Sequence, residues 1–143
     1  QLGAWAEVET VQKVVEALRE VLPHLDTPLV FTNGDYNPIN FLTDGQRVSG
    51  FVDFEGACFE NPHIGFVKFL LWGQDDYGWG TGVKAGLVER YLYSQNISRR
   101  EFSPLLLLRG LRHLILETSL EENDREWREH YLSILELALR ELR

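Results

Sequence analysis

The sequence contains little of what would tie it to an oxidising compartment, a membrane or a nucleic acid. Cys58 is the only cysteine among 143 residues, so no disulfide can form within the chain and a reducing compartment is expected. No apolar run approaches the roughly 20 residues that a membrane-spanning helix needs. Basic residues number 14 against 22 acidic ones, which gives a net charge of −8 without a basic patch. We therefore expect a cytoplasmic protein whose partners include neither membranes nor nucleic acids.

The length and composition are typical of one globular domain. Hydrophobic residues make up 44% of the chain and charged residues 25%, which is ordinary for soluble proteins with one sizeable core. No repeat, low-complexity tract or inter-domain linker is visible. We therefore expect a single domain over residues 1–143.

Apolar residues recur at helical spacing over most of the chain. This periodicity predicts helices over residues 7–22, 62–72, 83–94, 103–119 and 124–142. Ser98 and Glu101 have the spacing of a capping box, which is typical of a helix N-terminus. The stretch 73–82 is rich in glycine, aspartate and aromatic residues and is predicted to be a loop. The expected fold class is α+β, mostly α.

One β-hairpin is predicted among the helices, at about residues 39–54. The short apolar run 29–31 ends at four turn-forming residues, 32–35. A second apolar stretch then leads into Asp44-Gly45, a strong hairpin-turn signal, and the return strand is expected over 47–54. Because irregular segments that interrupt regular elements tend to carry function, the chemistry is expected here.

Polar residues gather at the open end of this hairpin. Asp35 and Asn40 are five residues apart at its entry, and Asp53 follows Asn40 by thirteen residues at its exit. Since a hairpin returns to its starting end, Asp53 is expected to lie near the other two. An aspartate, an asparagine five positions later and then a second aspartate is the layout of kinase phosphoryl transfer.

The residue types suit that chemistry. Magnesium prefers hard oxygen ligands and keeps several waters, so Asn40 and Asp53 would suffice beside nucleotide phosphates. Asp35 would orient an acceptor hydroxyl and take its proton as base, while Gly34 permits a tight backbone turn before it. On an extended chain, Glu55 would project from the same face as Asp53, roughly 7 Å away. Glu55 then serves equally well as a second metal contact or as an ion-pair partner.

Other residues near the site have weaker signals. Asp75, Asp76, Tyr77 and Trp79 would suit an acceptor pocket, with carboxylates for amines and rings for cations, but an exposed loop explains them equally well. Lone cysteines are most often buried hydrophobes, and this is the interpretation of Cys58.

The segments Asn33–Leu42 (NGDYNPINFL) and Gly50–Ala57 (GFVDFEGA) resemble the catalytic loop and the metal-binding segment of the aminoglycoside phosphotransferase and choline kinase family. Asn61-Pro62 is similar to the Asp-Pro that follows in that family. The resemblance implies a protein-kinase-like fold whose C-terminal lobe supplies the base, the magnesium ligands and the acceptor pocket. It further implies ATP as co-substrate, Mg²⁺ as cofactor and a small-molecule hydroxyl, possibly on a cationic compound, as acceptor.

The chain departs from that family pattern in three ways. The family usually has a histidine at Asn33, which with Gly34 would support the loop, and an aspartate at Gly65, which would anchor the loop backbone. Its preceding β-rich lobe, with a phosphate-covering loop and a lysine, has no counterpart in the 34 residues before Asp35. The resemblance therefore implies that residues 1–143 are the C-terminal lobe of a longer enzyme. Alone, this lobe would bind ATP poorly, and its partner would be the N-terminal lobe.

Two alternatives remain open. Asn33 and Gly65 motivate a kinase-fold ligand-binding protein without catalysis. Asp53 and Glu55 would suit a metal-dependent hydrolase, since paired carboxylates can act as acid and base, but this alternative leaves Asp35 and Asn40 unexplained.

Overall fold

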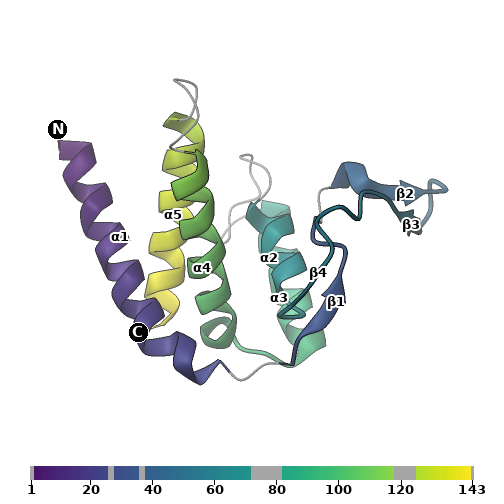
Figure 1. The fold of residues 1–143 in the computed structure, drawn as a ribbon, viewed down its shortest axis with the longest axis horizontal. Helices are drawn as coiled ribbons and strands as arrows, with labels where there is room; N and C mark the ends of the chain where they lie inside the picture. Colours follow the sequence, from purple (N-terminus) through teal and green to yellow (C-terminus); the bar gives the residue numbers. More distant parts are fainter. Residues whose placement is uncertain (1, 26–27, 36–37, 72–81, 118–124, 143) are drawn as a thin grey trace. The chain divides into compact units, whose positions relative to one another are not determined.

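The structure is a computed structural model that describes residues 2–25, 28–35, 38–71, 82–117 and 125–142 (Figure 1). It divides the chain into two compact units. The helical unit comprises residues 1–25 and 73–143, and the hairpin unit comprises residues 26–72.

The described residues of the helical unit form four α-helices. They are α1 (Leu2–Val21), α3 (Gly82–Gln95), α4 (Arg99–Glu117) and α5 (Arg125–Glu141), and a 3₁₀ turn, Leu22–His24, extends α1. In Figure 1, α1, α4 and α5 lie side by side and pack on one another. Their facing sides bury an apolar core, which includes Val14, Leu18, Leu106, Leu107, Leu135 and Ala138. Each helix predicted in this unit is present, because the apolar stripes have one buried face to occupy.

Helix α4 begins at Arg99, four residues before the predicted start, because the Ser98–Glu101 capping box forms. The backbone N–H and the hydroxyl of Ser98 each donate to Glu101 Oε2 at 2.7 Å, and Glu101 N–H donates to Ser98 Oγ at 3.2 Å. These hydrogen bonds lower the pKa of the Glu101 carboxyl below its usual value.

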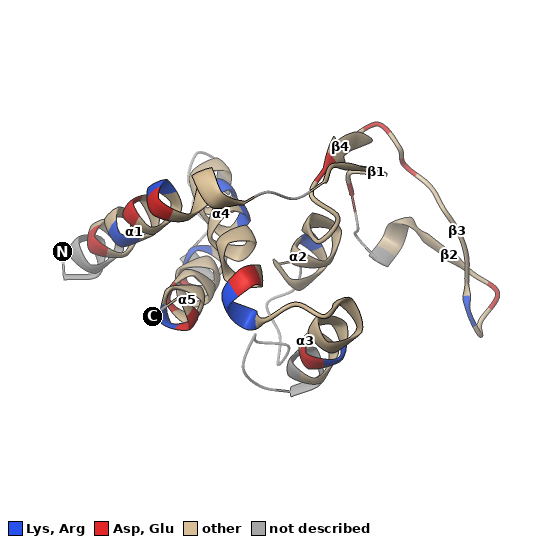
Figure 2. Cartoon of the chain, turned by 90° about the horizontal axis from the view of Figure 1, so that it is seen from below, with Lys and Arg blue, Asp and Glu red and all other residues tan. Residues whose placement is uncertain are grey.

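Charged residues of both signs are interspersed along α1 (Figure 2), and those from Glu9 to Glu20 are exposed. One adjacent pair, Glu9 and Lys13, is in contact, with Lys13 Nζ 2.6 Å from Glu9 Oε1. Among the described residues, no helix combines the length and the apolar character that crossing a membrane requires.

The predicted hairpin is present in the hairpin unit. Strand β2 (Phe41–Thr43) pairs antiparallel with β3 (Val48–Phe51), with Phe41 opposite Phe51. The turn is closed by Asp44, whose Oδ1 accepts from the N–H groups of Gln46 and Arg47 at 3.0 Å each. The ladder is shorter than the predicted 39–54, because residues 38–40 form a 3₁₀ turn (η2) and the return strand ends at Phe51.

A second antiparallel ladder corrects the prediction of one hairpin. Strand β1 (Val30–Thr32) pairs with β4 (Cys58–Glu60), which places Thr32 opposite Cys58. The three-residue β4 is too short for a recognisable period, so its pairing was not predicted. The fold class is α+β, mostly α, as predicted. The ladder ties the chain just before Asp35 to the chain just after Glu55.

Helix α2 (Ile64–Leu71) completes the hairpin unit and begins two residues after Pro62. Ile64, Val67, Leu70 and Leu71 are buried. Cys58 is exposed, so the prediction that it is a buried hydrophobe is wrong. Cys58 lies on the short two-stranded β1–β4 ladder, which leaves its side chain exposed.

Candidate functional site

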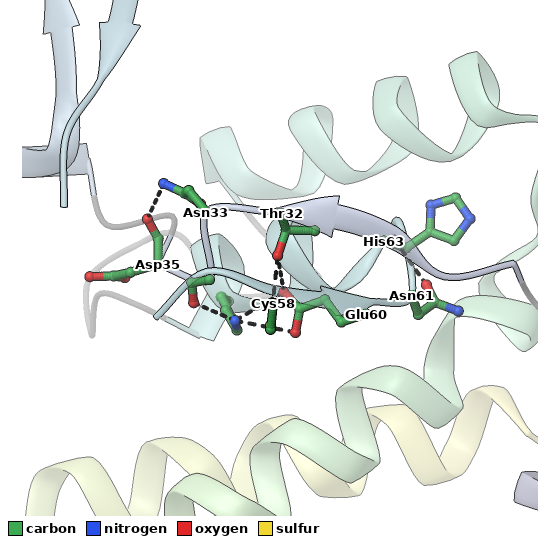
Figure 3. A network of polar contacts seen from close by, with 9 residues as sticks. Thr32, Asn33, Asp35, Cys58, Glu60, Asn61 and His63 are labelled. Carbon is green, nitrogen blue, oxygen red and sulfur yellow. Dashed lines mark hydrogen bonds and ion pairs between the residues drawn. The ribbon is translucent and has the colours of Figure 1, made fainter. Parts of the chain in front are cut away.

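Side chains hold the backbone on both sides of Asp35. Lys68 Nζ, from α2, donates to the carbonyl oxygen of Gly34. Asn33 Nδ2 donates to the carbonyl oxygen of Asp35 at 2.9 Å, as Figure 3 shows. The orientations of the two peptide groups that follow Gly34 and Asp35 are therefore fixed by side chains. We call residues 33–35 the Asp35 loop.

Asp35 and Asn40 are brought together, as their spacing predicted. Asn40 Nδ2 donates to Asp35 Oδ2 at 2.8 Å. Asn40 is only 6% exposed and ends the 3₁₀ turn before β2, so its amide is held in one place. Because the amide nitrogen makes this bond, the carbonyl arm of the same amide offers a hard oxygen donor.

The segment leading to Asp53 is tied to Asn40 through the backbone. Val52 N–H donates to Asn40 O at 2.9 Å, one step beyond the β2–β3 ladder. Asp53 follows with a φ of 61°, in the left-handed region. This conformation is strained for a residue with a Cβ, by about 1–2 kcal/mol. Strain of this kind is held where the surrounding structure imposes it, and the Asp53 carboxylate is exposed there.

The Asp35 loop is in backbone contact with the turn that follows Asp53. Gly34 has a φ of +81°, and a Cβ at this position would lie 1.7 Å from the carbonyl oxygen of Gly56. Only glycine allows both this conformation and this approach. Gly34 therefore does more than relax the turn before Asp35, because it lets the two segments touch.

The expected geometry of Asp53 and Glu55 is wrong. The prediction needed an extended chain, but Asp53 is left-handed and residues 54–57 form a turn closed by Ala57 N–H to Phe54 O at 3.0 Å. The two carboxylates therefore do not follow one another on one face of a strand. Glu55 is exposed.

A part-buried ion pair next to the Asp35 loop was not predicted from the sequence. Lys68 Nζ lies 3.1 Å from Glu60 Oε1, and the two side chains are 15% and 11% exposed. Thr32 Oγ1 donates to the same Glu60 oxygen at 2.8 Å (Figure 3). The sequence signal was Lys68 itself, which is the only charged residue of α2.

Asp75, Asp76, Tyr77 and Trp79 lie outside the described residues. His63, at the approach to α2, has its pKa lowered by burial, and its backbone N–H donates to Asn61 Oδ1 at 2.9 Å. Among the described residues, no three His, Cys, Asp or Glu side chains gather into a metal-binding group. Any cation here would therefore need other oxygen donors, such as an amide or a phosphate.

The chain matches the model of the phosphotransferase enzyme family over residues 1–130, and it belongs to that family. No curated protein and no solved structure matches the chain. The match confirms the resemblance seen in residues 33–42 and 50–57, and it extends over α1, α3 and α4, which showed no family motif. The class of protein is thus a phosphotransferase-family enzyme.

Proposed function

We propose that this chain is the C-terminal catalytic lobe, with a protein-kinase-like fold, of a kinase that transfers the γ-phosphoryl group of ATP to a hydroxyl of a small molecule. Family membership supports phosphoryl transfer. The hydrogen bond between Asn40 and Asp35 supports the kinase-type site, because it joins two of the residues that the kinase layout requires.

Asp35 is the base in this proposal. The acceptor hydroxyl oxygen forms a bond to the γ-phosphorus while the bond from that phosphorus to the β,γ-bridging oxygen breaks, and ADP departs. The hydroxyl proton passes to the Asp35 carboxylate. The bond from Asn40 Nδ2 holds the carboxylate in one rotamer, and the bonds to the Gly34 and Asp35 carbonyls hold its backbone. This preorganisation is the main contribution that the protein makes to such a reaction.

The donor set fits magnesium. The Asn40 carbonyl arm and the Asp53 carboxylate are hard oxygen donors on two segments that the Val52–Asn40 hydrogen bond joins. Asn40 and Asp53 would hold the ion, with Glu55 as an additional contact or an ion-pair partner. When bound, Mg²⁺ neutralises charge on the nucleotide phosphates.

The acceptor class is a small hydroxyl compound, such as an aminoglycoside, a choline-like amine, another amino-alcohol or a sugar. Asp75, Asp76, Tyr77 and Trp79 are the proposed acceptor contacts. The net charge of −8 favours the approach of a cationic acceptor. An N-terminal lobe of the same protein, working in the cytoplasm, would cover the nucleotide.

The test measures ADP formation by the full-length protein with ATP, Mg²⁺ and a panel of these acceptors. Asp35→Asn is expected to lower kcat by about 10²- to 10⁴-fold, the usual contribution of a general base. Asp44→Asn, at the exposed hairpin turn, is the matched control and should keep the parent rate. Equal rates for Asp35→Asn and the parent would remove Asp35 from the mechanism.

A catalytically impaired ligand-binding protein is the second candidate, and Asn33 favours it. Asn33 is buried, and its Oδ1 has no hydrogen-bond partner within the described part of the chain. A buried polar atom of this kind weakens the loop that must hold Asp35. This candidate predicts that the full-length protein binds MgATP and forms no ADP with any acceptor.

A further inference from the structure

Lys68 is a part-buried charge in an otherwise apolar helix, and such a charge needs polar partners. Its helix, α2, has the sequence IGFVKFLL, in which the other seven residues are uncharged. The Lys68 side chain is 15% exposed, and its ammonium group donates to Gly34 O and to both carboxylate oxygens of Glu60. Three donors on one ammonium are thus directed to three oxygen acceptors.

The partner carboxylate is itself held. Glu60 ends β4, and Thr32, buried at the end of β1, donates its hydroxyl to Glu60 Oε1 at 2.8 Å. Because Thr32 immediately precedes the Asp35 loop, the network joins α2, β4 and β1 at the base of that loop. We call Thr32, Glu60 and Lys68 the lysine anchor.

Lys68 contacts the loop from a position one helical turn after Gly65. Residues three apart on a helix lie on one face, so Lys68 rises from the same face of α2 as Gly65. Gly65 has no side chain to offer the loop. The long lysine side chain reaches the Gly34 carbonyl instead, directly before Asp35.

We propose that Lys68 is a positioning residue for Asp35, which it acts on through the Gly34 carbonyl, with Glu60 and Thr32 fixing the ammonium group. The proposal rests on the proposed function of Asp35 as base. The bond from Lys68 sets the plane of the Gly34–Asp35 peptide, and Asn33 sets the plane of the next one. A displacement of about 1 Å in a reacting group costs about a hundredfold in rate.

The variants must separate positioning from folding. Lys68→Met removes the donor and also the cation that pairs with the part-buried Glu60 carboxylate, which destabilises the fold. Lys68→Met combined with Glu60→Gln removes both charges and keeps the Thr32 contact, so stability should return toward that of the parent. The Gly34 carbonyl still lacks its donor in this double variant. Lys13→Met, which breaks an exposed pair with Glu9, is the matched control.

A spectroscopic readout is available on the 143-residue chain. Gly34-Asp35 is the only Gly-Asp dipeptide in the sequence. Labelling glycine carbonyls with ¹³C and aspartate nitrogens with ¹⁵N therefore yields one carbonyl–amide cross-peak, which reports on the Gly34 carbonyl. Loss of a hydrogen bond to that oxygen moves its ¹³C resonance upfield.

We expect the upfield shift in the Lys68→Met and Glu60→Gln double variant, its reversal in Lys68→Arg, and no shift in Lys13→Met. In the full-length enzyme the double variant should lower kcat about a hundredfold while KM for MgATP changes less than about twofold. A double variant that regains stability and also regains the parent resonance or the parent kcat would overturn the inference.

The two proposals fail in different ways. If Asp35→Asn keeps the parent rate, the proposed function fails, whatever the Gly34 resonance does. If Asp35→Asn loses activity but the double variant keeps it, Asp35 remains the base and only the role of Lys68 is wrong.

Discussion

Asn40 Nδ2 donates a hydrogen bond to Asp35 Oδ2 at 2.8 Å, across a chain separation of five residues. This contact predicts that the two side chains act as one unit. Asn40→Ala should lower kcat by roughly 10²-fold, since the base loses its fixed rotamer. The variant combining Asp35→Ala with Asn40→Ala should lose little more than Asp35→Ala alone, because residues of one catalytic unit are non-additive.

A double-mutant cycle on the full-length enzyme measures this coupling from kcat. The fold-losses of the two single variants, if multiplied, should greatly exceed the loss in the double variant. Losses that simply multiply would show that the two residues work independently and that the hydrogen bond has no catalytic role.

The close approach of Gly34 to Gly56 predicts an unequal response of two glycines to the same substitution. Gly34 and Gly45 both have positive φ, at +81° and +90°. A Cβ at Gly45 meets nothing within 4 Å, whereas a Cβ at Gly34 would lie 1.7 Å from a backbone oxygen. Gly45→Ala should therefore cost only the backbone strain, about 1 kcal/mol. Gly34→Ala should cost well over 3 kcal/mol, because backbone atoms must move apart.

Urea unfolding of the two variants measures the difference. Gly45→Ala serves as the control for left-handed strain, and the excess in Gly34→Ala reports the contact with Gly56. Equal free energies of unfolding would show that the loop and the turn are not in contact in solution.

Replacing Asp53 with glycine is predicted to stabilise the fold and to abolish activity. Its φ of 61° is strained for aspartate and unstrained for glycine. Asp53→Gly should raise the free energy of unfolding by about 0.5–1 kcal/mol while abolishing Mg²⁺-dependent turnover. Asp53→Asn, which tolerates the left-handed region, should leave stability near that of the parent and lose turnover as well.

Chemical unfolding and Mg²⁺ titrations of activity separate these effects. A stabilised Asp53→Gly enzyme that keeps the parent Mg²⁺ response would exclude Asp53 as a metal ligand. A destabilised one would show that the carboxylate is needed for the turn itself.

The parts of the fold and of the site that the sequence could predict are those with a local pattern. The spacing from Asp35 to Asn40, the Asp44-Gly45 turn and the Ser98–Glu101 box all lie within a few residues of chain, and each forms the contact predicted. The helices could be predicted from their apolar stripes, because this spacing is also local in the sequence.

What could not be predicted depends on contacts between distant segments. Strand β4 is a strand only because β1 lies beside it, and Lys68 can be part-buried only because Glu60, eight residues away, pairs with it. The left-handed conformation of Asp53 was likewise not predicted, and it removes the extended geometry that was expected for Asp53 and Glu55. Tertiary pairing decides such features, and periodicity carries no information on it.

The capping box before α4 predicts a pH-dependent contribution to stability. Glu101 Oε2 accepts hydrogen bonds from the hydroxyl and the N–H of Ser98, and these bonds lower its pKa from the usual 4.5. A carboxyl whose folded pKa is depressed stabilises the fold above its unfolded pKa, and this stabilisation is lost as the pH falls through the folded pKa. Ser98→Ala should therefore lower Tm by roughly 2–5 °C at pH 7. The difference in Tm between Ser98→Ala and the parent should narrow as the pH falls below about 4.5.

Ser94→Ala is the control, because Ser94 is an exposed serine that donates to the Tyr91 carbonyl and not to a carboxylate. The Tm values are measured by thermal unfolding, followed by circular dichroism, at pH 7 and at a pH below about 4.5. A Tm gap of the same size at pH 7 and in acid would show that the ionised form of Glu101 contributes nothing to the start of this helix.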